Sequence, residues 1–478
     1  MSVIETRPFT IPVDDVYSAL KSWHRGSGAG SPLHGLLLVR QARASTSRSE
    51  HEITNALRRH ALNELYTTHI LEADILRQRF LDAQPAYHVA NRFNLSEATL
   101  YRRQSEGVAR LAAIIQRQED AARASRIIQL TQRLEAPNYS RLIGAERHLS
   151  RVLDLLAAPG PPWLLMFAGI GGIGKTSLAD ALLRRLVRAD LDTEIGWVSA
   201  RTQGFSLSGV IQTVARPVLT TEALVDALAA QLLRDVPGLK LRTSMERQDA
   251  LRARLKEKPH AIVIDNLETV VDVSSLLPLL RSLANPTRFI LTSRQSLFEE
   301  GDIFHYPVPE LDEPNALAFV RWEAALRNLP ALEQAPDHDL LPIYTTVGGN
   351  PLVLRLVVGL THTHALDAVL DDLATARGAS TENLYQFIYR RAWDELDDAT
   401  RQTFLAMPLV SACGGSIGFL AEVSRLSGSE VRHALERLVA LNLVDSRGGL
   451  HERRYTIHNL TRTFLQEQVA QWYTPNPI

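Results

Sequence analysis

The chain has 478 residues, of which 45% are hydrophobic and 22% charged, and its formal net charge is −1 at pH 7. This composition is typical of a soluble globular protein, and the length predicts three or four domains. A near-neutral chain has no global attraction to nucleic acid or membrane, so such binding would need a local patch. The single cysteine, Cys413, excludes an internal disulfide framework and a cysteine metal cluster.

The N-terminus lacks the apolar stretch of a signal peptide. No apolar run approaches the roughly 20 residues that span a bilayer. The nearest run, Leu352–Val358, carries Arg355 at its centre. These features predict a cytoplasmic protein without membrane contact.

Residues 1–135 are expected to form an α-helical N-terminal domain. Within it, His88–Arg103 reads as two helices around a tight turn, with Ser96 capping the second helix, which is a helix-turn-helix pattern. We expect Ala90, Leu95 and Leu100 to pack the helices together. The exposed polar residues would then be Ser96, Glu97, Thr99, Arg102 and Arg103. These residues could contact DNA, or the helices could contact a protein; the nearly equal numbers of acidic and basic residues favour protein.

The next stretch carries the clearest motif in the chain. A short apolar run, Trp163–Ala168, precedes Gly169–Ser177, and a helical pattern follows, which places G-x-x-x-x-G-K-[ST] between strand and helix. The glycines let successive N–H groups face a phosphate chain at a helix N-terminus. Lys175 would reach the β- and γ-phosphates, and Thr176 would coordinate Mg²⁺. The predicted nucleotide-binding residues here are Gly169, Gly171, Gly172, Ile173, Gly174, Lys175, Thr176 and Ser177.

Strands alternate with helices up to about Pro309, which predicts an α/β P-loop NTPase domain with a parallel sheet at residues 136–309. Asp265 ends an apolar strand at the edge where parallel sheets bind ligands, and it would hold Mg²⁺ together with Thr176. Arg294 ends a neighbouring strand and would contact the γ-phosphate.

Catalysis is expected to be weak. Many ATPases carry a second acid directly after the strand-ending aspartate, but this chain has Asn266, whose amide is no base. Glu268 is the nearest substitute. The predicted catalytic set is therefore Lys175, Asp265 and Glu268, with slow hydrolysis of ATP.

Two further domains are expected after the sheet. Residues 310–380 are helical throughout and predict a lid domain. Residues 381–478 contain helices followed by a hairpin pattern around Gly448, which predicts a winged helix. The helix at Ser429–Leu441 is apolar on its core side, which disfavours DNA contact there.

Five motifs in order resemble those of NB-ARC proteins, which are signal-transducing STAND ATPases related to apoptosome scaffolds and plant disease-resistance proteins. The resemblance covers about residues 140–470. Its motifs are the P-loop, Ile262–Asp265, Thr292–Arg294, Gly348–Leu352 and Thr456–Leu460, the last similar to the family's Met-His-Asp motif. The resemblance implies that Pro351 packs on the base or sugar of the nucleotide and that His458 reaches the β-phosphate of ADP.

Three positions depart from the family pattern. Asn266 replaces the second acid, Asn459 replaces the aspartate of the last motif, and Ala145 stands where the family has a nucleotide-contacting arginine. STAND proteins usually continue into repeat arrays that sense the trigger, whereas this sequence stops about twenty residues after His458. We therefore expect the trigger to enter through the N-terminal domain, a partner protein or an exposed helix.

The resemblance implies a signalling switch that is closed by ADP and opened by exchange for ATP. Activation would produce a homo-oligomer or release the N-terminal domain to act on a protein effector. The alternative is an ATP-dependent transcription regulator that binds DNA through the N-terminal helix-turn-helix.

Overall fold

The computed structural model describes residues 9–24, 31–189, 192–200, 220–238, 243–267, 270–293, 300–376, 389–390, 392–394, 396–410, 414–441, 443–448, 452–457, 461–462 and 465. The chain divides into two compact units, one comprising Met1–Gln132 with Arg185–Asp192 and the other Arg133–Arg184 with Thr193–Ile478. The four domain ranges expected from the sequence stay predictions.

The first unit is helical. Its longest helix, α6, has 35 residues and begins at Ser96, whose side chain accepts a hydrogen bond from the Thr99 amide. A capping box between Ser49 and Glu52 starts α3 in the same way. The helices are α1 (Val13–Lys21), α2 (Leu37–Ser45), α3 (Glu50–Thr68), α4 (Ile70–Leu76), the π-helical turn η1 (Arg77–Leu81), α5 (Ala86–Arg92) and α6 (Glu97–Thr131).

The second unit is organised around a parallel sheet of five strands in the order β2-β3-β4-β1-β5. The strands are β1 (Leu164–Ala168), β2 (Glu194–Ser199), β3 (His260–Leu267), β4 (Arg288–Ser293) and β5 (Ile303–Pro307). β1 lies between β4 and β5, and all of its residues are buried. The sequence prediction of a parallel sheet is confirmed, and β2 and β5 are its edge strands.

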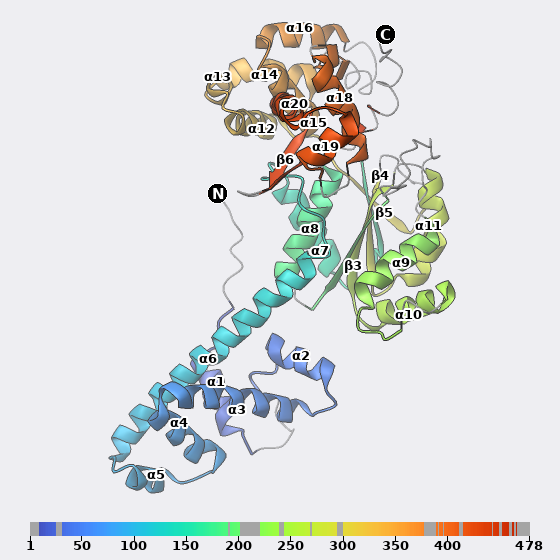
Figure 1. The fold of residues 1–478 in the computed structure, drawn as a ribbon. Coiled ribbons are helices and arrows are strands. Elements are labelled where there is room, and N and C mark those ends of the chain that lie inside the picture. Colours follow the sequence, from blue (N-terminus) through green and yellow to red (C-terminus); the bar gives the residue numbers. More distant parts are fainter. Residues whose placement is uncertain are drawn as a thin grey trace. The chain divides into compact units, whose positions relative to one another are not determined.

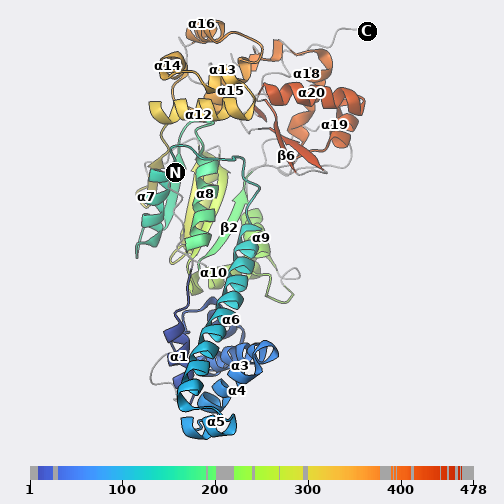
Figure 2. The same cartoon turned by 90° about the vertical axis from the view of Figure 1, so that its left-hand side faces the viewer.

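Helices cover both faces of this sheet. Figures 1 and 2 show α7 (Glu146–Ala157) beside α8 (Lys175–Ala189) on one face. The other face carries α9 (Thr221–Leu232), α10 (Ser244–Glu257) and α11 (Val270–Leu283), whose leucines share an apolar core with the strands (Figure 1). β3 is buried on both faces, as expected for a central strand of a parallel sheet.

Helices and a small hairpin follow the sheet. The first group is α12 (Glu313–Leu326), α13 (Pro330–Glu333), α14 (Asp337–Val347), α15 (Pro351–Leu360) and α16 (Leu366–Ala376). The second group is α18 (Asp398–Ala406), the 3₁₀ turn η3 (Met407–Leu409), α19 (Ile417–Ser424) and α20 (Gly428–Ala440), followed by antiparallel β6 (Asp445–Gly448) and β7 (Arg453–Thr456). This second group has the expected helices-then-hairpin order of a winged helix. Within the described ranges, no single helix is long and apolar enough to cross a membrane, and only α14 with α15, bent by 120°, passes as a pair.

Candidate functional site

The P-loop connects β1 to α8. Gly172 and Gly174 have φ values of +73° and +100°, which glycine adopts without steric cost. The loop therefore curls around the N-terminus of α8, where free amide groups and the helix dipole favour an anion. Ile173 is buried and anchors the loop, while Ile170 is exposed. This geometry fits the phosphate cradle expected from the sequence.

Lys175 lies over the inside of this loop. Its ammonium group donates hydrogen bonds to the carbonyl oxygens of Gly169 at 2.6 Å and Ile170 at 2.9 Å. Phosphate oxygens are stronger acceptors than neutral carbonyls because the hydrogen bond is then ionic on both sides. The Lys175 side chain is thus held where a phosphate chain in the loop would meet it.

Asp265 and Thr176 lie together, as the sequence predicted for residues at one edge of the sheet. The Thr176 hydroxyl donates to Asp265 Oδ1 at 2.7 Å, and the Thr292 hydroxyl donates to the same oxygen at 2.6 Å. Asp265 is fully buried and Thr292 is 1% exposed. One carboxylate and one hydroxyl beside a phosphate site are a donor set that suits Mg²⁺. Within the described ranges no cluster of three or more His, Cys, Asp or Glu residues could hold a metal ion, so a metal here would also need phosphate or water ligands.

The residue after Asp265 has an unusual backbone. Asn266 has φ +68° at a point where the register between β3 and β4 shifts. Asparagine tolerates this left-handed conformation better than most residues. The Asn266 amide donates to the Thr292 hydroxyl at 2.8 Å, which fixes the bulge. Asn266, which stands where many ATPases have a second acid, is thus a residue that suits this left-handed backbone conformation.

The start of α15 contacts the P-loop through Asn350, a residue to which the sequence analysis gave no role. Asn350 Nδ2 donates to the Gly171 carbonyl oxygen at 3.1 Å. Its Oδ1 caps α15 by accepting from the Leu352 amide at 3.1 Å, and Asn350 is 1% exposed. A signal existed, since Asn before Pro at the first helical position is an N-cap pattern. Pro351 follows it, half-buried at the first turn of α15.

Glycines make this contact close. A Cβ on Gly172 would stand 2.6 Å from Leu352 Cβ, and a Cβ on Gly349 would stand 1.9 Å from the Leu311 carbonyl oxygen. The Leu311 amide in turn donates to the Gly349 carbonyl at 2.9 Å. Gly172 therefore allows α15 to approach the P-loop, and Gly349 allows the start of α15 to approach the segment that leaves β5.

Three predicted site residues, Glu268, Arg294 and His458, lie outside the described residues, as does Asn459. Ala145 precedes α7, and Arg147, two residues later, is exposed. Burial, followed by the charges of Arg147 and Arg151, lowers the pKa of His148, whose Nδ1 lies 2.8 Å from the Tyr306 hydroxyl.

The two helices around a tight turn are present, with two corrections. α5 and α6 flank a turn in which Asn94 has φ +52°, and Ala90 and Leu100 are buried at their contact, with Leu95 packed against them. Arg103 was predicted to be exposed, but it is half-buried. It donates to Glu72 at 3.0 Å and to Glu106 at 3.3 Å, and the Glu72 side chain is only 7% exposed. Arg103 neutralises a buried carboxylate. Thr99, also predicted to be exposed, is half-buried and lies 2.8 Å from the Ser96 hydroxyl.

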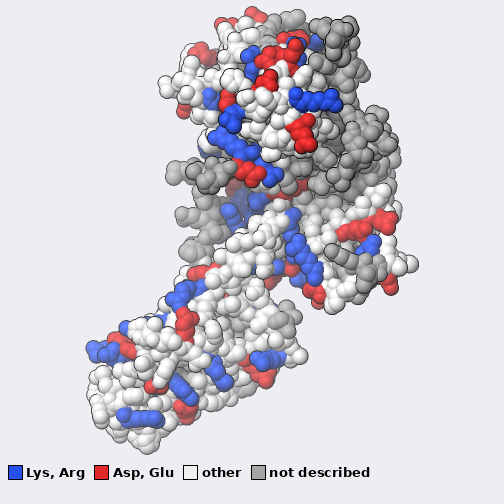
Figure 3. Space-filling model, viewed as in Figure 1, with Lys and Arg blue, Asp and Glu red and all other residues white. Residues whose placement is uncertain are grey.

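The surface around these helices carries mixed charge. On the face shown in Figure 3, basic and acidic side chains alternate over the N-terminal helices. DNA-binding surfaces concentrate basic residues on one face. The charge pattern on this face therefore favours protein contact over DNA contact.

A chain of charged residues joins α12 and α15 to the β6–β7 hairpin. Arg355 on α15 donates to Asp445, the first residue of β6, and its Nε lies 3.7 Å from Glu323 Oε2. Arg327 also pairs with Glu323. All four side chains are at most 23% exposed. The charge inside the apolar run Leu352–Val358 thus has a partner in the hairpin.

Together, the sheet and the loop define a P-loop nucleotide-binding domain. Residues 145–302 match the sequence profile of the NB-ARC domain. The chain therefore carries an NB-ARC domain, a class that binds ATP or ADP. No curated protein matches the sequence.

Several solved structures are similar in fold. A STAND protein with a tetratricopeptide repeat sensor from Pyrococcus horikoshii is 16% identical with a TM-score of 0.45, and the match covers 70% of this chain and 43% of that chain. A Walker-type ATPase of Pyrococcus abyssi is 14% identical with a TM-score of 0.35, covering 70% and 98%. AMPPCP-bound DnaA from Aquifex aeolicus is 13% identical with a TM-score of 0.31, covering 63% and 90%. The chain spans less than half of the first of these.

Proposed function

We propose that the protein is a nucleotide-operated signalling switch of the STAND type, held closed by ADP and opened by exchange for ATP. The observation that carries the proposal is the hydrogen bond from Asn350 to Gly171, because it makes the position of the lid depend on the conformation of the phosphate-binding loop. A ligand shifts such an equilibrium only by contacting the two states differently. A phosphate chain bound in the loop would contact the same loop backbone to which Asn350 donates its hydrogen bond.

The winged helix joins this mechanism through α15. Asn350 caps the helix, and Arg355 on the same helix pairs with Asp445. Asp445 lies opposite Thr456 in the hairpin. Thr456 is two residues before His458 in the sequence. We propose that His458 donates a hydrogen bond to the β-phosphate of ADP. The P-loop, α15 and the β6–β7 hairpin would then all be connected through the bound nucleotide. Imidazole can donate this hydrogen bond in its neutral or protonated form.

Hydrolysis would act as a slow reset. Bound Mg²⁺ would neutralise phosphate charge, with Thr176 and Asp265 as its protein ligands. Lys175 would stabilise charge on the phosphate oxygens, and Arg294 would contact the γ-phosphate. Asn266 supplies no base, which leaves Glu268 as the candidate for orienting water. The chain's own residues therefore favour sensing over rapid turnover.

The output is proposed to be a protein contact of the N-terminal domain or a homo-oligomer. The α5–α6 pair keeps DNA binding as a second candidate, because Arg102 and Glu97 are exposed at the start of α6. An electrophoretic shift assay with the full chain, with and without ATP, separates the two. Nucleotide-dependent binding to DNA would establish the second candidate.

The experiment that tests the switch compares hydrogen exchange of the full chain with ADP and with a non-hydrolysable ATP analogue, both with Mg²⁺. We expect different protection at α15 and at β6–β7. Lys175→Ala is the control and should abolish both responses, because its ammonium group is lost from the loop. Equal protection patterns with both nucleotides bound would overturn the proposal.

A further inference from the structure

The segment Arg133–Tyr139, here called the strap, follows directly on α6. α6 ends at Thr131, and the strap begins two residues later. It is tied along its length to the P-loop helix α8 and to the start of β2. The strap is therefore the part of the chain that follows α6 and enters the second unit.

The strap contacts the P-loop itself at one point. The Ser177 hydroxyl donates to Asn138 Oδ1 at 2.8 Å. Ser177 lies in the first turn of α8, directly after the proposed Mg²⁺ ligand Thr176. This contact places the strap next to the expected phosphate site.

Two further contacts hold the strap on α8. The Tyr139 hydroxyl donates to Asp180 Oδ2 at 2.7 Å, and Asp180 is 5% exposed. Arg184 donates to the same carboxylate at 2.8 Å and to the Glu135 carbonyl oxygen at 2.7 Å. Burial, reinforced by the charge of Asp180, raises the pKa of Tyr139, which keeps the hydroxyl protonated as a donor.

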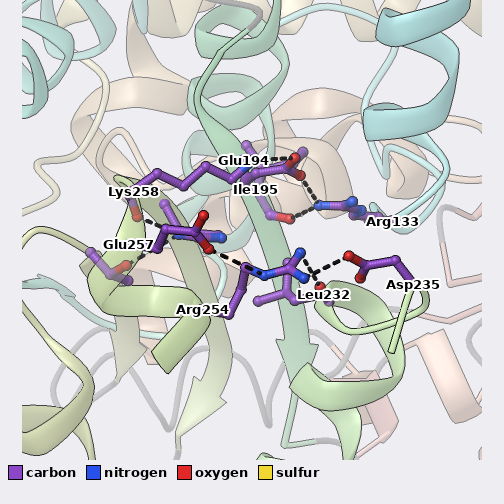
Figure 4. A network of polar contacts seen from close by, with 10 residues as sticks. Arg133, Glu194, Ile195, Leu232, Asp235, Arg254, Glu257 and Lys258 are labelled. Carbon is purple, nitrogen blue, oxygen red and sulfur yellow. Dashed lines mark hydrogen bonds and ion pairs between the residues drawn. The ribbon is translucent and has the colours of Figure 1, made fainter. Parts of the chain in front are cut away.

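The start of the strap is fixed to the opposite end of the sheet. Arg133 donates to Glu194 Oε2 at 2.6 Å and to the Ile195 carbonyl oxygen at 2.9 Å (Figure 4). Lys258 donates to the other oxygen of Glu194 at 3.1 Å. The Arg133 and Glu194 side chains are 14% and 12% exposed, so this ion pair is well shielded from water. The strap thus has a firm anchor at Arg133 and a hydroxyl contact at Asn138.

We infer that the strap responds to nucleotide occupancy, because Asn138 competes with a phosphate oxygen for the Ser177 hydroxyl proton. A serine hydroxyl has one proton to donate. A phosphate oxygen is a charged acceptor, and charge-assisted hydrogen bonds are about twice as strong as neutral ones. Nucleotide binding therefore releases Asn138 and loosens the strap between Asn138 and its anchor at Arg133. The inference rests on the proposed nucleotide site.

Thermodynamic linkage determines whether loosening the strap strengthens or weakens nucleotide binding. If the nucleotide loosens the strap, then loosening the strap must favour the nucleotide by the same factor. Asn138→Ala removes the competing acceptor and should tighten ADP binding about 2- to 10-fold, the worth of one neutral hydrogen bond. Asn138→Asp keeps an acceptor, makes it charged and adds a negative charge near the phosphates, so it should weaken ADP binding. A merely structural role would not give opposite signs.

The test measures ADP affinity by calorimetry and hydrogen exchange of residues 133–139, using the full chain and both variants. Asn91→Ala, on the exposed side of α5, is the matched control and should leave both readouts unchanged. ADP should raise exchange in the strap of the wild type, and Asn138→Ala should reduce that increase. Unchanged or weaker ADP binding by Asn138→Ala, or a strap that does not respond while ADP binds, would overturn the inference and leave the switch standing. Failure of the wild type to bind ADP would overturn both.

Discussion

The side-chain amide of Asn350 donates a hydrogen bond to the Gly171 carbonyl oxygen, joining the cap of α15 to the middle of the P-loop across 179 residues of sequence. One side chain thus performs two tasks, since Oδ1 starts the helix and Nδ2 holds the loop. The two tasks can be separated by substitution.

Asn350→Asp keeps the capping oxygen but loses the donor to Gly171. We expect α15 to remain intact and ADP to bind more weakly, because the carboxylate repels both the carbonyl and nearby phosphate. Asn350→Ala loses both tasks and should cost about 1 kcal/mol more in unfolding free energy than the Asp variant through the lost cap. Thermal unfolding and calorimetry measure the two effects.

Thr220→Ala is the control for these variants, because Thr220 caps α9 by accepting from the Ala223 amide. It should lose a similar cap energy and leave ADP affinity unchanged. Equal ADP affinity in Asn350→Asp and the wild type would contradict the role given to the Gly171 contact.

Gly172→Ala tests the close approach of lid and loop. Gly172 and Gly238 have nearly the same φ, +73° and +69°, but a Cβ would meet Leu352 at 2.6 Å only at Gly172 and nothing within 4 Å at Gly238. Both alanine variants should lose about 1–2 kcal/mol through the left-handed backbone. Gly172→Ala should lose more and should show faster hydrogen exchange at α15. If the two variants were equally stable with the same exchange, the lid would not depend on that contact.

The Arg355–Asp445 pair is predicted to couple the lid to the winged helix. A double-mutant cycle with Arg355→Gln and Asp445→Asn should give a coupling free energy of about 0.5–3 kcal/mol, as expected for contacting groups shielded from water. The exposed pair Arg321–Asp337, where the aspartate side chain is 77% exposed, is the matched control and should give at most about 1 kcal/mol. A coupling no larger than that of the control would mean that the hairpin is not held through Arg355.

Stability should fall in mild acid because of His260. The ring lies at the start of β3, 2% exposed, and burial lowers its pKa to about 4. The unfolded chain then binds a proton below pH 6.5 that the folded chain binds only near pH 4, so stability is lost as the pH falls through that window. Between pH 7.5 and 5 the loss is expected to be about 2 kcal/mol from this residue.

Denaturant unfolding of the wild type and of His260→Gln at both pH values isolates this contribution, because glutamine does not titrate. The variant should lose less stability than the wild type over the same interval. If the free energy of unfolding changed equally with pH in the two proteins, His260 would not be buried in its neutral form.

Local patterns were enough to predict much of this molecule. Hydrophobic periodicity predicted the strands, and the spacing of glycines predicted the P-loop. The contact between Thr176 and Asp265 followed from the rule that parallel strands end at one edge of the sheet. Side chains whose partners are distant in sequence could not be placed. Arg103 was expected to be exposed, and its contact with Glu72 was missed because Glu72 lies on another helix, 31 residues earlier. Asn138, Asn350 and Arg355 likewise owe their roles to partners in other elements.

The central claim is that this P-loop holds ADP tightly as part of a closed state. The direct measurement is the amount and identity of nucleotide released by acid from freshly purified full-length chain, with Lys175→Ala beside it. We expect close to one ADP per chain in the wild type and none in the variant. A wild-type protein that is empty, and that exchanges added ADP as rapidly as the variant, would contradict it.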